Sequence, residues 1–264
     1  MPSELDASTF QRKLETLAEV LAQKLRREAP KYRTEQATNL RWFADQGYLV
    51  LSPDYELSTP QRSTWMTAGQ DVACAFLWAQ EHVADYGGDP SLLFGDGGSA
   101  GGQLVLSQTY AANSGNPLAV CDGKTAVSVK AVAADVPALD PLSFYNNPDP
   151  LLGSWSREMV AQYLGGPPDQ YPNRVSYVSS KTYITRQAPP TIIFLRNDDH
   201  LVPIEGSLAF IDQNHRAGTN PRVVRLPLAD HVSVFNFHSV ADQAFLQLTY
   251  QFYCEHGGLC AAEK

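Results

Sequence analysis

Apolar and polar residues recur along the chain with two different periods, and these periods predict its elements. Over residues 8–29 apolar residues recur at steps of three and four until Pro30 ends the run, which predicts an amphipathic helix. From residue 36 onward helical and strand patterns alternate. Helices are predicted at 36–46, 67–85, 156–164, 204–215 and 239–253, and another opens after the glycines at 97–102. Strands are predicted at 48–52, 92–94, 127–134, 191–195 and 222–226.

This alternation predicts an α/β fold. Strands separated by helices of this length are typical of βαβ units, in which a parallel sheet carries helices on both faces. Residues 138–188 interrupt the rhythm, because they are rich in Pro, Asn, Tyr and Ser. A segment of this kind between a strand and the next βα unit usually covers a site. We therefore expect a helical extension at 1–35 and one domain at 36–264, with a cap insertion at about 138–188.

Composition and charge exclude several classes of protein. Hydrophobic residues make up 44% of the 264 residues, which allows a sizeable core. The net charge of −8 argues against a nucleic-acid partner, which requires a basic face. No apolar run approaches the roughly 18–20 residues of a membrane span, and the first residues lack the apolar core of a signal peptide. As written, the chain is expected to be cytoplasmic, or extracytoplasmic if its true N-terminus lies upstream. Oligomeric state is not predicted.

The cysteines match no metal-binding pattern. Cys74, Cys121, Cys254 and Cys260 have no zinc spacing, and no CxxC or HExxH motif occurs, so we expect no bound metal. Buried or incidental thiols are the simplest interpretation. In an oxidising compartment Cys254–Cys260 is a candidate disulfide, and Cys74–Cys121 is a less favoured one.

The strongest chemical signal is the GxSxG motif Gly97-Gly98-Ser99-Ala100-Gly101, which follows a predicted strand and precedes a predicted helix. In that setting Gly97, Gly98 and Gly101 permit a sharp turn that lifts the serine hydroxyl clear of the sheet. The first amides of the helix then face the site, so the N–H of Ala100 is a candidate oxyanion donor. Ser99 is the candidate nucleophile. The same loop lacks the Lys and the Ser/Thr of a phosphate-binding loop, and we expect no cofactor.

A nucleophilic serine needs a base, and the base needs an orienting carboxylate. After a GxSxG elbow the acid and then the histidine follow in chain order, each just after a strand. Asp199 follows the strand at 191–195, and His231 follows the strand at 222–226. Spacing favours Asp199 over Asp198, which stays open as an alternative.

The remaining histidines fit the role of base less well. They lie in helices, at a helix start, in the tail or too close to the candidate acid, and they are His82, His200, His215, His238 and His256. Asp230, beside His231, is interpreted as a loop acid exposed to solvent. The sequence therefore predicts a triad of Ser99, His231 and Asp199.

Several segments together resemble the hormone-sensitive-lipase-like carboxylesterases of the α/β-hydrolase superfamily. The segments are Gly47–Tyr55 (GYLVLSPDY), Tyr86–Pro90 (YGGDP), Gly98–Gly102 (GSAGG), Tyr163–Gly166 (YLGG) and Asp199–Pro203 (DHLVP). The resemblance covers about residues 36–253. It implies a serine ester hydrolase with Ser99 as nucleophile, Asp199 as acid and His231 as base. It also implies a small-molecule ester as substrate and a cap that shapes the acyl pocket.

The chain departs from this family at three places. Residues 1–46 lack the family's His-Gly-Gly motif, whose amides complete the oxyanion hole, and His256-Gly257-Gly258 is no substitute because it follows a helix. The residues before 48 also read as helix where the family has strands. In the family sheet, the strand that bears the His-Gly-Gly motif lies between those matching 48–52 and 92–94. Asp96 replaces a small or apolar residue and must be paired, exposed or protonated, while Arg196 replaces a glycine. Two alternatives therefore stand beside an active esterase: an impaired or truncated scaffold that acts as a binding protein, and a prolyl-peptidase-like serine peptidase.

Overall fold

The computed structural model describes residues 32–118, 120–121, 123–125, 128–231 and 239–258. Within them the centre of the molecule is a parallel sheet in the spatial order β1-β4-β5-β6. Its strands are β1 (Phe94–Gly98), β4 (Ala131–Asp135), β5 (Thr191–Arg196) and β6 (Arg222–Leu226). Each strand is joined to the next by a segment with at least one helix, as parallel pairing requires. The predicted α/β fold is confirmed.

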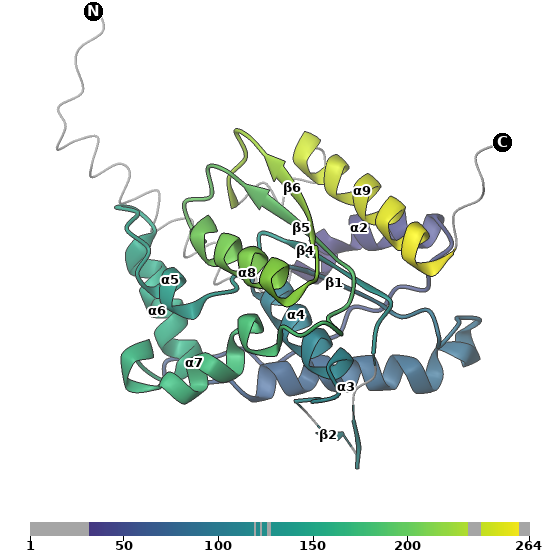
Figure 1. The fold of residues 1–264 in the computed structure, drawn as a ribbon, viewed down its shortest axis with the longest axis horizontal. Helices are drawn as coiled ribbons and strands as arrows, with labels where there is room; N and C mark the ends of the chain where they lie inside the picture. The colour runs from purple at the N-terminus through teal and green to yellow at the C-terminus, as the bar shows by residue number, and fades with distance from the viewer. Residues whose placement is uncertain (1–31, 119, 122, 126–127, 232–238, 259–264) are drawn as a thin grey trace, which may run out of the picture.

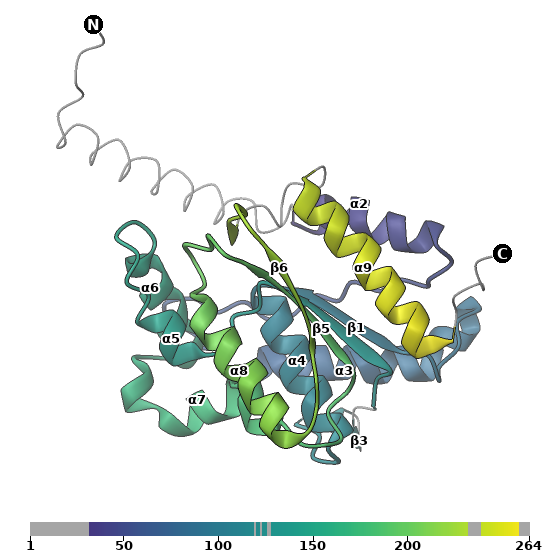
Figure 2. The ribbon, with the colours of Figure 1, turned by 45° about the horizontal axis from the view of Figure 1, so that its top comes forward.

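Helices cover both faces of this sheet (Figures 1 and 2). On one face lie α2 (Tyr32–Asp45) and α9 (Val240–Gly257), which share a core with the strands around Phe43, Phe194 and Phe245. The other face carries α3 (Thr67–His82), α4 (Ala100–Asn113) and α8 (Ile204–Ala217). Every residue of β4 and β5 is buried, because these two strands lie in the middle of the sheet with helices on both sides.

The strand predicted at 48–52 is wrong: residues 48–58 form neither helix nor strand. A strand needs a hydrogen-bonded neighbour, and on this side the sheet of described residues ends at β1. The apolar side chains of this segment therefore do not belong to a strand. Val50 packs against the core between α2 and α9, whereas Leu49 and Leu51 are 44% and 43% exposed.

Element boundaries moved where glycine or tertiary packing decided them. β1 begins two residues later than predicted and runs through glycines, and the helix from Thr67 ends at His82 in a 3₁₀ turn, η2 (Val83–Tyr86). Only the second half of the strand predicted at 127–134 is β4. The last helix begins at Val240, one residue after its predicted start, with Ser239 as its N-cap. The predicted helix at 8–29 and His238 lie outside the described residues.

The residues between β4 and β5 include the predicted cap and form short helices at one end of the molecule (Figures 1 and 2). They are α5 (Pro141–Tyr145), α6 (Gly153–Leu164), η3 (Pro168–Gln170), α7 (Pro172–Val178) and η4 (Ser180–Tyr183). This segment has a small core of its own around Val160, Leu164 and Val178. Such a core explains why a stretch rich in Pro and Asn is nevertheless ordered into helices.

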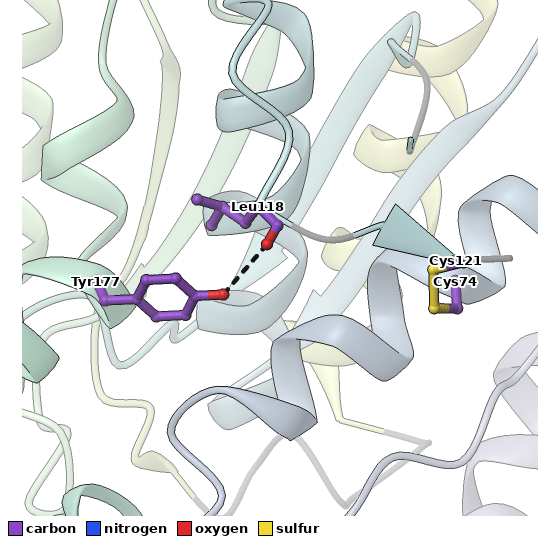
Figure 3. Close-up of a disulfide and its surroundings, with 4 residues drawn as sticks. All are labelled: Cys74, Leu118, Cys121 and Tyr177. Carbon is purple, nitrogen blue, oxygen red and sulfur yellow. Dashed lines mark hydrogen bonds between the residues drawn. A yellow bond between two sulfur atoms is a disulfide. The ribbon is translucent and has the colours of Figure 1, made fainter. Parts of the chain in front are cut away.

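A disulfide joins Cys74 in α3 to Cys121 in the short hairpin of β2 (Val120–Cys121) and β3 (Lys124–Thr125) (Figure 3). This is the pairing that the sequence favoured less. Cys254 is a buried free thiol in α9, and Cys260 lies outside the described residues. Close to the disulfide, the Tyr177 hydroxyl of α7 donates a hydrogen bond to the main-chain oxygen of Leu118 at 3.4 Å.

Among the described helices, none combines the length and the apolar character that crossing a bilayer requires.

Candidate active site

Three side chains meet beyond the carboxyl ends of β1, β5 and β6. Ser99 follows β1 directly, while Asp199 and His231 lie in the loops after β5 and β6. The Oγ of Ser99 lies 2.9 Å from the Nε2 of His231, and the Nδ1 of His231 lies 2.8 Å from the Oδ2 of Asp199. The side chains of His231 and Asp199 are 3% and 2% exposed. The structure therefore brings together the serine, histidine and acid that the sequence singled out.

Ser99 has a strained backbone, with φ +53° and ψ −119°. A side chain at positive φ costs on the order of 1–3 kcal/mol, so neighbouring contacts must hold it. The N–H of Ser99 donates to the Asp135 carbonyl of β4 at 2.8 Å, and the Ser99 carbonyl accepts from the N–H of Gln103 at 3.1 Å. Gly98, the residue before Ser99, is paired with Asp135 of β4 in the sheet, and this pairing fixes the end of β1 from which the turn at Ser99 begins.

Close approach of the backbone to itself explains the glycines of the turn. A Cβ on Gly97 would lie 2.5 Å from the carbonyl carbon of Gly101, and one on Gly102 would lie 2.9 Å from the Gly97 oxygen. At Gly101 itself a Cβ would meet nothing within 4 Å. The steric requirement for glycine therefore falls on Gly97 and Gly102, whereas at Gly101 no neighbouring atom excludes a side chain.

The amide of Ala100 is the first of α4. The first N–H groups of a helix have no acceptor within the helix, and the helix dipole adds partial positive charge there. Ala100 is also exposed. Its N–H is therefore a candidate donor to a negatively charged oxygen beside Ser99.

The loop after β5 fixes the Asp199 carboxylate from two sides. Its Oδ1 accepts the N–H groups of Leu201 at 3.0 Å and Val202 at 2.8 Å, while Oδ2 faces His231. When the Nδ1 of a neutral His231 donates to this carboxylate, its Nε2 is the ring nitrogen that can accept a hydrogen bond. The Nε2 is then the acceptor for the Ser99 hydroxyl.

The alternative acids lie elsewhere. Asp198 is exposed, and it is Asp199 that contacts His231. Asp230 pairs with His200 at 3.1 Å, in a contact exposed to solvent, and this hydrogen bond raises the pKa of His200. The Oδ1 of Asp230 also accepts the N–H of His231 at 2.5 Å, so the Asp230 side chain points back to the main chain of its neighbour.

Asn147 is a site residue that the sequence did not indicate. It lies in the cap segment after α5, is 3% exposed, and its Nδ2 donates to the main-chain oxygens of His200 and Leu201, both at 2.9 Å. These contacts join the loop of Asp199 to the cap. An isolated Asn in a polar segment has no pattern by which sequence reasoning could have found this role.

The two unusual charges beside the triad have different environments. Asp96 is exposed on β1, and the surrounding protein together with Asp135 raises its pKa to about 7. Arg196 is fully buried at the end of β5, where its Nη2 lies 2.6 Å from the Oδ2 of Asp135. Of the three options open for Asp96, the structure supports exposure together with partial protonation near neutral pH. Over the part of the chain that is described, no group of three or more His, Cys, Asp or Glu side chains is placed to hold a metal ion.

Comparison with solved structures places the fold among esterases. The chain resembles esterase 2 of Thermogutta terrifontis phosphonylated by sarin, with a TM-score of 0.62 and 25% identity over 79% of this chain and 73% of that one. The same esterase phosphorylated by paraoxon gives a TM-score of 0.61 at 25% identity, over 79% and 71% of the two chains.

Curated relatives point the same way. The probable carboxylic ester hydrolase LipM of Mycobacterium tuberculosis is 29% identical over 71% of this chain, and the esterase LipQ of the same organism is 30% identical over 70%. In both cases the chain spans 42% of the relative's length. The family model BD-FAE matches residues 27–213, a range that contains Ser99 and Asp199 and ends before His231. With more than half of its residues in that match and its fold among the esterases, the chain belongs to the BD-FAE family of α/β-hydrolase carboxylesterases.

Proposed function

We propose that the protein hydrolyses carboxylic esters by acyl transfer through Ser99. The observation that carries the proposal is the continuous series of short contacts from Ser99 Oγ to His231 Nε2 and from His231 Nδ1 to Asp199, at 2.9 and 2.8 Å. Hydrogen-bond distances of this kind between nucleophile, base and acid define the geometry of serine hydrolases. The esterase relatives and the family support the same reaction class.

In the proposed mechanism Ser99 attacks the ester carbonyl while His231 takes the hydroxyl proton. The buried Asp199 carboxylate stabilises the imidazolium that forms and keeps the ring in the tautomer that accepts at Nε2. His231 then gives its proton to the leaving alcohol, which leaves Ser99 acylated. A water molecule, activated by the same imidazole, releases the acid in the second half of the reaction.

The developing oxyanion is held by the amide of Ala100, at the start of α4. Loss of one oxyanion donor typically costs 10²–10³ in turnover. The family's second donor belongs to the His-Gly-Gly motif that residues 1–46 lack.

We propose that residues 138–188 act as the cap and contribute to the acyl pocket. Their tie to the loop of Asp199 through Asn147 supports this role, since a cap that moves relative to the triad could not define a pocket. The substrate class proposed is a small-molecule ester with a small to medium acyl group. No cofactor takes part in this reaction scheme.

An oxidising compartment is the location we propose. Disulfides persist in extracytoplasmic spaces and are rare in the cytosol, and the Cys74–Cys121 bond therefore favours the extracytoplasmic location of the two considered above. Alkylation of native extracts with a maleimide reagent tests it: labelling of either cysteine before reduction contradicts the proposal.

The test of function uses the purified chain with p-nitrophenyl acetate and butyrate and with a fluorophosphonate probe. We expect product release and a probe adduct on Ser99 by peptide mass spectrometry, both abolished in Ser99→Ala and His231→Gln. Ser91→Ala is the matched control, because Ser91 is an exposed serine before the opposite end of β1. A protein that unfolds cooperatively but neither releases product nor accepts the probe would contradict the proposal and favour a binding scaffold.

A further inference from the structure

Among the described residues, Arg196 is the largest fully buried side chain, with an exposed fraction of 0%. The guanidinium stays charged at any ordinary pH, so burying it requires acceptors that compensate for lost water. Arg196 is the last residue of β5, and it lies where the resemblance to carboxylesterases leads one to expect glycine. The proposed triad mechanism gives no role to a positive charge at this position.

The guanidinium joins two parts of the site. Its Nη2 donates to the Asp135 carboxylate at 2.6 Å, and its Nη1 donates to the main-chain oxygen of His231 at 3.3 Å, with the Asp230 oxygen at 3.5 Å. The two ends of one rigid fork thus contact the end of β4 and the loop that carries the candidate base. This use of Arg matches its chemistry, since its donors have a fixed planar geometry.

Asp135 continues this connection to the nucleophile. Its main-chain oxygen accepts the N–H of Ser99 at 2.8 Å, while its carboxylate accepts from Arg196. A hydrogen-bonded path therefore runs from the Ser99 backbone through Asp135 and Arg196 to the His231 backbone. It lies alongside the path through the side chains of Ser99, His231 and Asp199, and it acts on the main chains that position those side chains.

The loop after β6 is tied to the rest of the site through its main chain, where the Ala229 carbonyl also accepts the Asp198 N–H at 3.3 Å. Leu228 has φ +58° and is 94% exposed, whereas Ala229 and His231 of the same loop are buried. The His231 N–H is bonded to Asp230, and its carbonyl is bonded to Arg196. Burial raises the pKa of Asp135 to about 6, while the charges of Arg196 and His231 lower it, which indicates that these three groups interact.

We propose that Arg196, neutralised by Asp135, is a positioning residue that holds the main chain of His231 in register with Ser99. This inference rests on the proposed esterase function, because a fixed distance between base and nucleophile matters only if a proton passes between them. A misplacement of about 1 Å can lower a rate on the order of 100-fold without abolishing binding.

Two variants separate positioning from simple stabilisation. Arg196→Lys keeps a positive charge for Asp135, but a single ammonium cannot reproduce the fork that reaches the His231 carbonyl. The double variant Arg196→Met with Asp135→Asn removes both charges, and replacing a buried ion pair by neutral groups is often tolerated by the fold. Arg222→Lys is the matched control, since Arg222 lies on neighbouring β6 in an exposed ion pair with Glu255.

We expect kcat for p-nitrophenyl acetate to fall about 10- to 100-fold in Arg196→Lys and in the double variant, with KM within about threefold of wild type. Arg222→Lys should retain wild-type kcat. Melting temperatures of all three variants should stay close to that of wild type. A structural role alone predicts the opposite pattern, in which stability falls and the kcat of folded protein is unchanged. Full kcat in Arg196→Lys would overturn the inference.

Hydrogen exchange supplies a readout that does not depend on turnover. In both Arg196 variants the peptide Arg222–His231 should exchange its amides faster, while peptides from α3 and α8 keep their protection. If the wild-type protein hydrolyses no ester but this local change occurs, the proposed function fails, and only the anchoring of the His231 main chain by Arg196 stands. If ester hydrolysis occurs in wild type and neither kcat nor local exchange changes in the variants, the positioning role fails alone.

Discussion

Reducing the Cys74–Cys121 disulfide should destabilise the fold by several kcal/mol. The bond closes a loop with a sequence separation of 47 between α3 and β2, in a part of the chain that reaches across β1 and α4. In the chain-entropy description, closing a loop of that length in the unfolded chain removes entropy worth about 4 kcal/mol at 25 °C. Residual structure in the reduced, unfolded chain lowers this figure, so a loss of about 2–4 kcal/mol is expected.

The assay is guanidinium unfolding followed by circular dichroism, with and without a reducing agent. The midpoint should move to lower denaturant on reduction, and Cys74→Ala with Cys121→Ala should match the reduced wild type and no longer respond to reductant. Cys254→Ala is the control: this buried thiol takes no part in the bond, so its variant should keep the full response to reductant. Unfolding free energies within about 1 kcal/mol for oxidised and reduced wild type would refute the reasoning.

Three further predictions concern the site. Asp199→Asn should lower kcat about 10⁴-fold by favouring the wrong tautomer of the histidine, whereas exposed Asp198→Asn should leave kcat near wild type; equal losses would contradict the assignment of the acid. Gly97→Ala should abolish probe labelling, because its Cβ would lie 2.5 Å from backbone atoms, while Gly101→Ala, with no atom within 4 Å, should fold and be labelled; similar behaviour of the two would argue against this steric account. Burial raises the pKa of Asp135 to about 6, above its ordinary value, so the native state takes up the proton first and this group makes the protein more stable as pH falls from 7 to 4. Its contribution to the free energy of unfolding is about 3 kcal/mol at most. Plotted against pH over that range, the unfolding free energies of wild type and Asp135→Asn should therefore have different slopes. Parallel curves would exclude the effect.

Local signals in the sequence were sufficient to place the candidate nucleophile and much of the sheet. The elbow around Ser99 was recognisable because its glycines, its strand and its helix are adjacent in the chain. β5 and β6 were likewise visible as short apolar runs between turn residues, and β6 has the predicted bounds. The order of the triad residues followed from their places after strands, since parallel strands end at the same edge of a sheet.

Long-range pairing decided the rest. Residues 48–52 have the composition of a strand, but composition does not supply the neighbour that a strand needs, and the segment is irregular. The disulfide depended on how α3 packs beside the β2–β3 hairpin, which spacing between cysteines does not reveal.

The sequence by itself predicted the candidate site: a serine in a sharp turn, followed in order by an acid and a histidine. Only the tertiary structure decided which groups hold that chemistry in place. Asn147 and Arg196 contact main-chain oxygens of the loops that bear Asp199 and His231. A side chain bonded to a distant carbonyl leaves no pattern in the sequence, because every residue has a carbonyl and only the fold brings a particular one within reach.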